Sequence, residues 1–522
     1  LNLGLVSLKA ALGLARAGRR AEFEQIRNEL SSRYADEKVT LGGRTGVPAE
    51  LLRLLLDDSK GSEGSENAGT KGQADESGIG VDLAKPVDPA WQIRFAESVE
   101  AGMTRIELDQ WTSNALSGVV PVCAIDGKTL FLNYLGYILS LDLESGKLLW
   151  RTGSFHHLEL QANQPSMQML DTSRLAILAA NGYVWSLARD LKDQNYFGAF
   201  QLVCRRADNG EVVWKSPDLP DYAQLDFTGP PLLANGKLYL TAKTNWNPQQ
   251  RQGQSQQLVL AIRPQDGKQI WRAEIGVFRQ TQHMYWGYRR ESSPQPIMVY
   301  RNGAIYVDTH VGVLARLDAD SGECDWGYGY KTATVQSSWN FFYSYQPQEP
   351  QAPGGEPMRL GDAFLIKGMQ SDRLYAVEPN LMKVLWERPI TKSTRLLGVD
   401  EGKVYLGGAE LSALDLNTKK LAWATRIPKG SMEGRVLVRP DGLWQLTPRG
   451  IFEIDPKSGD VRRIFRGSDL GSAGGDLLLT GNWLLGISNR AITAYPRQVA
   501  GAREQISARD EGTRTQTGAA SP

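Results

Sequence analysis

The amino-acid sequence predicts an all-β fold, an eight-bladed β-propeller of four-stranded blades that is closed by an N-terminal strand and preceded by a short α-helical segment. Three observations lead to this prediction. A motif of a β-type run, a polar turn and a second β-type run that ends in an aromatic residue recurs seven times. Another hairpin pattern precedes each copy. Gly accounts for 54 of the 522 residues, a share typical of chains with many tight turns.

The seven copies predict the outer hairpin of each blade. Their turns usually contain Gly, which adopts the positive φ of hairpin turns without steric cost. The copies are LDLESGKLLW (141–150), RADNGEVVW (206–214), RPQDGKQIW (263–271), LDADSGECDW (317–326), VEPNLMKVLW (377–386), LDLNTKKLAW (414–423) and IDPKSGDVRRIF (454–465). Because the aromatic residue recurs at one distance from the turn in six copies, we expect it to pack between blades. The structural tryptophans predicted from this pattern and from the strand at 88–95 are Trp91, Trp150, Trp214, Trp271, Trp326, Trp386 and Trp423.

The blade count depends on the two ends of the repeat. Two hairpins per unit give four short strands, and repetition of such units with turn signals describes propeller blades. The last unit, TGNWLLGISNRAITAYPRQ, stops after three strands, and the segment DPAWQIRF (88–95) supplies a fourth. Seven complete blades and one closed by this strand make eight. Closure would leave no exposed sheet edge between the first and last units.

The remaining segments differ in composition. Residues 1–56 show apolar residues at helical spacing, and the stretch ALGLARAGRRAEFEQIRNEL resembles one helical hairpin of a tetratricopeptide-like repeat. Residues 57–86 are rich in Gly, Ser and acidic residues, which predicts a flexible linker. Residues 87–497 form the predicted propeller. Residues 498–522 lack apolar periodicity and are predicted to be disordered.

Composition excludes several classes of function. The net charge of +1 rules out binding of nucleic acid or an anionic bilayer by bulk charge. The three cysteines, Cys123, Cys204 and Cys324, lie far apart, which argues against a disulfide framework and a cysteine zinc site. We expect no membrane span, because the sequence has no run of 18 apolar residues. The given sequence starts at Leu1 instead of Met, so we expect that a natural N-terminus, with any signal peptide, has been removed from it.

Possible metal ligands have simpler explanations. Asp318 and Asp320 stand where the first ligands of a calcium loop would stand, but the twelfth position is Gly329 instead of Glu. The same residue types form the turns of the other repeats, so a turn is the favoured reading. His156 and His157 are adjacent, and their side chains would diverge on a strand. We therefore expect no metal site.

The repeat resembles the PQQ-like, quinoprotein-type propeller repeat over roughly residues 88–497. It is similar to quinoprotein dehydrogenases and to the propeller lipoprotein of the bacterial outer-membrane protein assembly machine, and both resemblances imply eight blades. In the dehydrogenases a disulfide between adjacent cysteines holds the quinone beside a calcium ion and an aspartate base. This chain has no adjacent cysteines. The resemblance therefore implies blade-packing tryptophans, no catalytic residues and no cofactor, and it implies export to the periplasm or cell envelope.

Loop lengths point to one face of the predicted propeller. In an antiparallel four-stranded blade, the first–second and third–fourth turns share a face, and the other connections lie on the opposite face. The insertions at 188–198, 244–256, 276–293 and 327–356 all belong to the second set. They are rich in aromatic residues and Arg, which are typical of recognition surfaces. The candidate binding residues are Tyr196, Phe197, Trp246, Tyr285, Trp286, Tyr288, Arg289, Arg290, Trp339, Phe341, Phe342, Tyr343 and Tyr345.

These observations favour a non-enzymatic scaffold that binds a protein or a peptide strand through the elaborated face of blades 2 to 5. A propeller that binds a glycan or another small ligand is the alternative, because sugars stack on the same aromatic side chains. A PQQ-dependent dehydrogenase is the third class. The loop rings could equally pack the loops onto the propeller or plug its channel. The identity of the partner and the role of residues 1–56 stay open.

Overall fold

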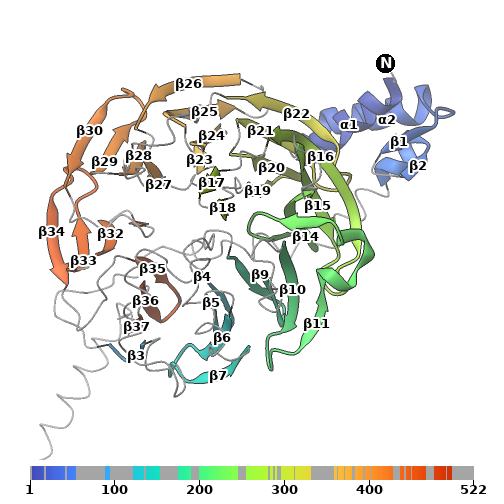
Figure 1. Ribbon diagram of the computed structural model, residues 1–522. Coiled ribbons are helices and arrows are strands. Elements are labelled where there is room, and N and C mark those ends of the chain that lie inside the picture. The colour runs from blue at the N-terminus through green and yellow to red at the C-terminus, as the bar shows by residue number, and fades with distance from the viewer. Residues whose placement is uncertain are drawn as a thin grey trace, which may run out of the picture. The chain divides into compact units, whose positions relative to one another are not determined.

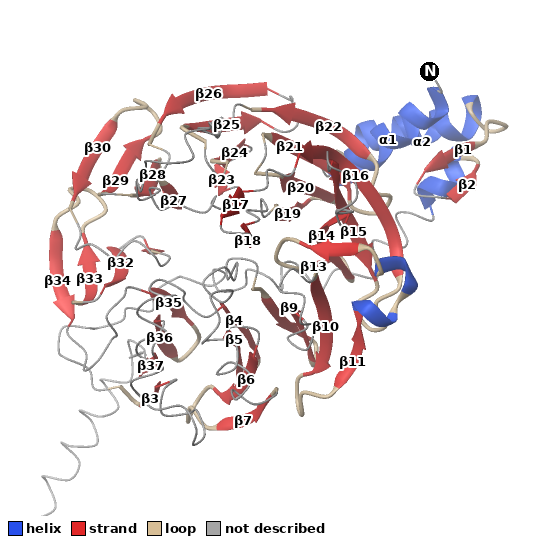
Figure 2. Ribbon diagram, viewed as in Figure 1, coloured by secondary structure: helices blue, strands red, loops and turns tan. Residues whose placement is uncertain are grey.

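The fold is described from a computed structural model, which places short antiparallel strands along most of the chain (Figures 1 and 2). It describes residues 3–16, 19–41, 44–53, 89–94, 122–134, 137–152, 175–189, 199–244, 254–279, 283–285, 288–290, 296–310, 312–330, 358–360, 363–368, 371–378, 383–391, 394–400, 402–408, 410–426, 436–439, 442–447, 449–465, 475–488 and 491–496. The chain divides into two compact units. Unit 1 comprises residues 1–69, 122–143 and 148–399, and unit 2 comprises residues 70–121, 144–147 and 400–522.

The N-terminal part of unit 1 is helical. Helices α1 (Leu3–Arg16) and α2 (Arg20–Arg33) are followed by a hairpin of β1 (Val39–Leu41) and β2 (Arg44–Gly46). The two helices and the following residues share a small apolar core that includes Leu8, Leu30, Val39, Leu51 and Leu52. Helical spacing of the apolar residues accounts for this core. No helix in the described ranges is long and apolar enough to cross a membrane.

Five antiparallel sheets follow among the described residues of unit 1. The first sheet consists of β4 (Val122–Asp126), β5 (Thr129–Tyr134), β6 (Tyr137–Asp142) and β7 (Leu148–Arg151). The second consists of β8 (Ile177–Ala180), β9 (Tyr183–Arg189), β10 (Phe200–Arg206) and β11 (Val212–Lys215). The third consists of β12 (Leu225–Phe227), β14 (Lys237–Thr244), β15 (Gln254–Ile262) and β16 (Gln269–Arg279), with β13 (Leu232–Ala234) also paired to β14.

The fourth and fifth sheets repeat the same strand order. The fourth consists of β19 (Ile297–Arg301), β20 (Ala304–Asp308), β21 (Val313–Asp318) and β22 (Cys324–Gly329). The fifth consists of β23 (Met358–Leu360), β24 (Ala363–Ile366), β25 (Arg373–Glu378) and β26 (Lys383–Pro389). A separate hairpin pairs β17 (His283–Tyr285) with β18 (Tyr288–Arg290).

The sheets further along the chain have the same pattern. One consists of β27 (Arg395–Asp400), β28 (Lys403–Gly407), β29 (Leu411–Asp415) and β30 (Leu421–Thr425). The other is an eight-stranded sheet, whose first four strands along this part of the chain are β31 (Leu437–Arg439), β32 (Gly442–Thr447), β33 (Gly450–Ile454) and β34 (Val461–Phe465). Its remaining strands join through β32, where Leu446 pairs with Gly475. The last three strands are β35 (Gly475–Leu479), β36 (Trp483–Ser488) and β37 (Ala491–Pro496), and β3 (Trp91–Arg94) pairs antiparallel with β37, with Trp91 opposite Ala494. The fold is therefore mostly β, with several four-stranded antiparallel sheets that resemble propeller blades.

Consecutive sheets of unit 1 pack on each other through apolar side chains. One cluster joins the second and third sheets, another joins the third and fourth, and a third joins the fourth and fifth. The strands β5, β14 and β20 are buried on both faces, whereas β26 alternates between exposed and half-buried residues. The core therefore lies between the sheets and near their middle strands, and the outer strands border solvent.

The predicted outer hairpins carry a repeated irregularity. Between the third and fourth strands the register shifts beside the tryptophan, for example where Cys204 pairs with Trp214 and Arg205 pairs with Val212. The shift recurs at the equivalent place in the other outer hairpins. Such a bulge increases the local twist and directs the next side chain. In the hairpin of β33 and β34, Arg463 and not Phe465 stands at the position that the tryptophans occupy, because Arg463 pairs with Glu453.

Candidate functional site

Most of the loop residues predicted to bind a partner lie outside the described residues. The exceptions belong to the hairpin β17–β18, where Tyr285 pairs with Tyr288, Met284 with Arg289 and His283 with Arg290. Their backbone places both arginines on one short strand. The predicted residues outside the described ranges are Tyr196, Phe197, Trp246, Trp286, Trp339, Phe341, Phe342, Tyr343 and Tyr345.

The predicted structural tryptophans lie on the outer strands, and Trp91 lies on β3. The indole Nε1 of Trp150, Trp214, Trp271 and Trp423 donates a hydrogen bond to a backbone carbonyl in the outer turn of the next sheet, at 2.8–3.1 Å. Trp214, Trp271 and Trp423 are buried, and the other four are half-buried. The four hydrogen-bonded rings therefore pack between neighbouring sheets.

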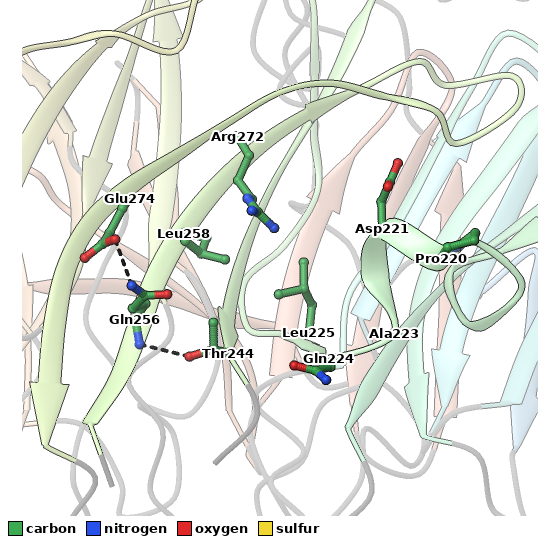
Figure 3. A pocket seen from close by; sticks show the side chains of 10 residues that line it. All are labelled: Pro220, Asp221, Ala223, Gln224, Leu225, Thr244, Gln256, Leu258, Arg272 and Glu274. Atoms are coloured by element: carbon green, nitrogen blue, oxygen red, sulfur yellow. Dashed lines mark hydrogen bonds between the residues drawn. The ribbon is translucent and has the colours of Figure 1, made fainter. Parts of the chain in front are cut away.

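An open cavity of about 590 Å³ lies between the segment that follows β11 and the outer strands of the third sheet (Figure 3). One wall is a segment with two short 3₁₀ turns, Ser216–Asp218 and Pro220–Tyr222. The opposite wall comes from β14, β15 and β16. The residues that line the cavity are Pro220, Asp221, Ala223, Gln224, Leu225, Thr244, Gln256, Leu258, Arg272 and Glu274.

Polar groups occupy the walls of this cavity and apolar side chains its base. The backbone N–H of Gln256 donates to Thr244 Oγ1 at 3.1 Å, and its side-chain Nε2 donates to Glu274 Oε2 at 2.9 Å (Figure 3). Leu225 and Leu258 are buried. The guanidinium of Arg272 points into the cavity and makes no hydrogen bond or ion pair with another described residue. The cavity thus offers an unpaired cation above an apolar base.

A buried ion pair holds the base of the cavity in place. Lys243 Nζ lies 3.3 Å from Asp226 Oδ2, and the two side chains are only 3% and 7% exposed. Asp226 Oδ1 also accepts a hydrogen bond of 2.8 Å from the backbone N–H of Phe200, in the second sheet. The pair therefore fixes β12 against β14 and connects the third sheet to the second.

The sequence reasoning did not identify this cavity. The signal that could have found it is the SPDLPDY stretch, where Pro217 and Pro220 are each followed by Asp. Pro at the first turn and Asp near the N-terminus are typical of short helical turns. An insertion of this kind between Trp214 and the next hairpin indicates additional structure beside the blade.

A second polar cluster is buried at the end of β20. The hydroxyl of Tyr330 donates to Asp308 Oδ1 at 2.5 Å, while Asp308 Oδ2 and both ring nitrogens of His310 have no hydrogen-bond partner among the described residues. His310 Nε2 lies 3.7 Å from Asp308 Oδ2. Burial, together with the charge and hydrogen bond of Asp308, holds the pKa of Tyr330 well above its usual value. The cluster contains a carboxylate, an imidazole and a phenol, but it does not open into the cavity described above.

The remaining carboxylate and thiol groups considered from the sequence take part in turns or are shielded by burial. Asp318 Oδ1 accepts backbone hydrogen bonds from Asp320 and Ser321, which closes the turn of the DADSG run. Within the described ranges, no three of His, Cys, Asp and Glu lie close enough to hold a metal ion. Burial raises the pKa of the Cys204 thiol to about 12 and also raises that of Cys324. A thiol with a raised pKa is a poor nucleophile at neutral pH.

Comparison with known proteins places these features in a family context. A family model described as outer membrane protein assembly factor BamB matches residues 108–465, more than half of the chain. Comparison with curated protein sequences gives no match.

Three solved structures illustrate the structural likeness. The BamB structure from Moraxella catarrhalis is 11% identical with a TM-score of 0.38, and the match covers 78% of this chain and 97% of that one. Quinohemoprotein alcohol dehydrogenase from Comamonas testosteroni is 11% identical with a TM-score of 0.48, covering 79% of this chain and 77% of that one. Saccharomyces cerevisiae Sqt1 is 8% identical with a TM-score of 0.43, covering 72% of this chain and 96% of that one.

Proposed function

Because the chain belongs to the family described as outer membrane protein assembly factor BamB, we propose that it is a non-enzymatic scaffold that binds proteins during the assembly of outer-membrane proteins. The family match over residues 108–465 is the observation that carries this proposal. It implies an exported protein that works in the cell envelope and has protein partners.

The proposed binding surface is the face that carries the long insertions of blades 2 to 5. Its support comes from the sequence, because Trp286, Arg289 and Phe342 belong to insertions in which aromatic residues and Arg are concentrated. Aromatic and Arg side chains contribute most of the binding energy in many protein interfaces. The opposite face has tight turns such as Asp266–Lys268, where backbone and Asp side chain close the turn by hydrogen bonds. Such short turns present little surface to a partner.

Site-specific photo-crosslinking in the bacterial cell tests this assignment. We expect a photoreactive residue at position 286 or 342 to cross-link to proteins of the outer membrane or of its assembly machinery. The matched positions are 147 and 457, which are exposed lysines in outer-hairpin turns and should give no such products. Cross-links found at the turn positions and absent at the loop positions would contradict the proposed face. Unchanged levels of outer-membrane proteins in cells without this protein would contradict the proposed process.

A triple substitution separates recognition from loop packing. If Trp286→Ala, Arg289→Ala and Phe342→Ala remove partner binding and leave the thermal unfolding curve unchanged, these side chains form a recognition surface. If they instead lower the free energy of unfolding by several kcal/mol, the rings form a packed loop core, because buried rings leave cavities when they are removed.

A further inference from the structure

The outer edge of β16 differs from the outer edges of the other sheets. Strand β16 has 11 residues, whereas β7 and β11 have four, β30 and β34 have five, β22 has six and β26 has seven. It ends its sheet, so no strand in the described part of the chain pairs with its outer edge. Alternate backbone N–H and C=O groups along this edge therefore lack a strand partner.

Native proteins usually protect such edges with short strands, Lys or Pro. The other outer strands have these features: β7 and β11 are short, and β26 starts with Lys383 and ends with Pro389. The sequence of β16, QIWRAEIGVFR, contains neither Lys nor Pro. It exposes two large apolar side chains, Ile270 at 47% and Val277 at 52%. Its length, its exposed apolar residues and its lack of Lys and Pro suit this edge to pairing with another strand.

The side chains beside this edge add a specific polar contact. Arg272 and Glu274 lie two residues apart on β16, and both line the cavity of about 590 Å³. Glu274 is engaged by Gln256, but Arg272 has no partner among the described residues. Asp221 lies on the facing wall of the cavity and forms no ion pair with Arg272 or with another described residue (Figure 3). A carboxylate delivered beside β16 would therefore meet a free guanidinium over the apolar surface of Leu258.

We propose that the outer edge of β16 accepts an extended segment of a partner protein as an added strand, with an acidic side chain of that segment paired to Arg272. The segment's backbone would satisfy the free N–H and C=O groups of the edge, and its alternate side chains would enter the cavity. This inference rests on the proposed scaffold function and assigns it a second surface, separate from the long loops, together with the chemistry of the segment bound there.

The irregularity of β16 defines where pairing occurs. The register with β15 shifts between Gln257 and Leu258, which leaves Ile275 as the extra residue. The cavity lies beside the stretch that ends at Glu274, on the N-terminal side of this bulge. We expect the acidic residue to pair with that stretch, and the residues past the bulge to contribute Val277 as an apolar contact.

A labelled peptide that alternates valine and threonine around one central glutamate serves as the probe, and fluorescence anisotropy measures its binding to the full chain. We expect saturable binding that weakens by about tenfold or more with Arg272→Glu, because a charge-assisted hydrogen bond becomes a repulsion. The same loss is expected when glutamine replaces the peptide's glutamate. Methylation of alternate peptide nitrogens along one edge should abolish binding, since it removes the donors of strand pairing while keeping the side chains. Amide hydrogen exchange of β16 should slow when the unmodified peptide is bound.

Two control variants separate this site from non-specific binding. Lys147→Glu reverses an exposed charge in another turn, and Leu385→Lys replaces an apolar residue on β26 that is 47% exposed. Neither should change peptide affinity, whereas Val277→Lys should weaken it. Absence of binding, or binding that tolerates both the methylated backbone and Arg272→Glu, would overturn the proposal. Self-association of the chain without peptide, abolished by Val277→Lys, would also overturn it by making a second copy the occupant.

The two sets of experiments distinguish a failure of the β16 edge site from a failure of the proposed scaffold function. If photo-crosslinks at positions 286 and 342 identify the expected partners but Arg272→Glu leaves peptide binding intact, the scaffold function stands and the edge site is wrong. If peptide binding follows the β16 variants but no cross-links form on the loop face, the edge site stands and the loop face is wrong.

Discussion

The indole ring of Trp271 occupies the space above Gly322, in the outer turn of the next sheet. A Cβ atom added at Gly322 would come within 2.5 Å of that ring, and Gly322 also has a φ of +73°. Glycine is therefore favoured at this position for two reasons: the positive φ of the backbone, and the lack of space for a Cβ atom beside the indole ring. The same relation pairs Trp91 with Gly146, Trp150 with Gly210, Trp214 with Gly267 and Trp423 with Gly459.

A pair of glycine substitutions measures the ring contact separately from the backbone effect. Gly236 has a φ of +67°, but a Cβ atom there would meet nothing within 4 Å. Gly236→Ala should therefore lower the free energy of unfolding by only about 1 kcal/mol, the cost of positive φ. Gly322→Ala should cost an additional ~1–3 kcal/mol, because the methyl group forces the indole of Trp271 to move. Urea unfolding of the two variants gives the comparison, and equal midpoints would contradict the packing role of the tryptophan.

The free energy of unfolding should depend on pH through Lys367, a buried lysine that follows β24. Burial, assisted by the charge of Arg395, lowers the pKa of Lys367 from 10.5 to about 8. Between these values the unfolded chain binds more protons than the folded one, so the contribution of Lys367 to stability rises with pH. Below pH 8 the charged side chain costs the folded state up to about 3 kcal/mol.

Replacement of the lysine tests this linkage. The stability of Lys367→Met relative to the wild type should be highest below pH 8 and should decline as the pH rises toward 10.5. Chemical unfolding between pH 7 and 10, for which Lys147→Met at an exposed turn serves as the control, measures the difference. A difference that does not change with pH would show that Lys367 keeps an ordinary pKa when the protein is folded.

At the scale of single elements, the outer hairpins were predictable because their signal is local. The Asp side chain and the positive-φ residue act within one turn, as in the turn of Asp415, where Lys419 takes a φ of 57° in place of Gly. The 3₁₀ turns of residues 216–222 and the length of β16 could not be predicted in the same way. They depend on packing between neighbouring sheets and on the ion pair of Lys243 with Asp226.

That ion pair is expected to stabilise the third sheet strongly because it is buried. Lys243→Met leaves the carboxylate of Asp226, which is 7% exposed, without its cation, and loss of one partner of a buried pair costs about 3–5 kcal/mol. Lys237 on the same strand pairs with Asp320 at 2.6 Å, but these side chains are 19% and 23% exposed. Lys237→Met should cost about 1 kcal/mol or less. Denaturant unfolding distinguishes the two, and similar losses would mean that Asp226 finds another donor.

At the scale of the whole molecule, the repeat predicted strand order and sheet composition well. Seven hairpins share one pattern, and six of them have a tryptophan at the same distance from the turn, which leaves little choice of pairing. The described outer hairpins follow that order. The candidate site was less predictable. Of the loop aromatics named from sequence, only Tyr285 and Tyr288 have a described backbone. The Arg272 cavity was missed, because a lone Arg on an amphipathic strand looks like any solvated residue. Loop length and aromatic content indicate a surface but do not place its side chains.

We propose that the strand β3 closes an eight-bladed propeller through its pairing with β37 and the packing of Trp91. Residues Trp91–Arg94 pair with β37 over four positions, and Gln92 Nε2 donates a hydrogen bond of 3.0 Å to Thr493 Oγ1. The ring of Trp91 also lies against Gly146, in the turn that connects β6 with β7. One short strand thus pairs with the edge of β37 and places its tryptophan against Gly146.

Two truncations test the closure. Deleting residues 1–80 removes the helical segment and most of the proposed linker, and it should leave the thermal unfolding of the sheets unchanged. Deleting residues 1–97 also removes β3, which exposes the edge of β37 and takes away the ring that covers Gly146. The second truncation removes both the half-buried ring of Trp91 and the pairing of β3 with β37, so it should melt at a clearly lower temperature than the first. It should also aggregate more readily, because an unpaired edge strand recruits other chains.

If a synthetic peptide of residues 86–97 restores the melting temperature of the longer truncation, the strand acts by pairing. Equal stability of the two truncations would contradict the proposed closure by β3.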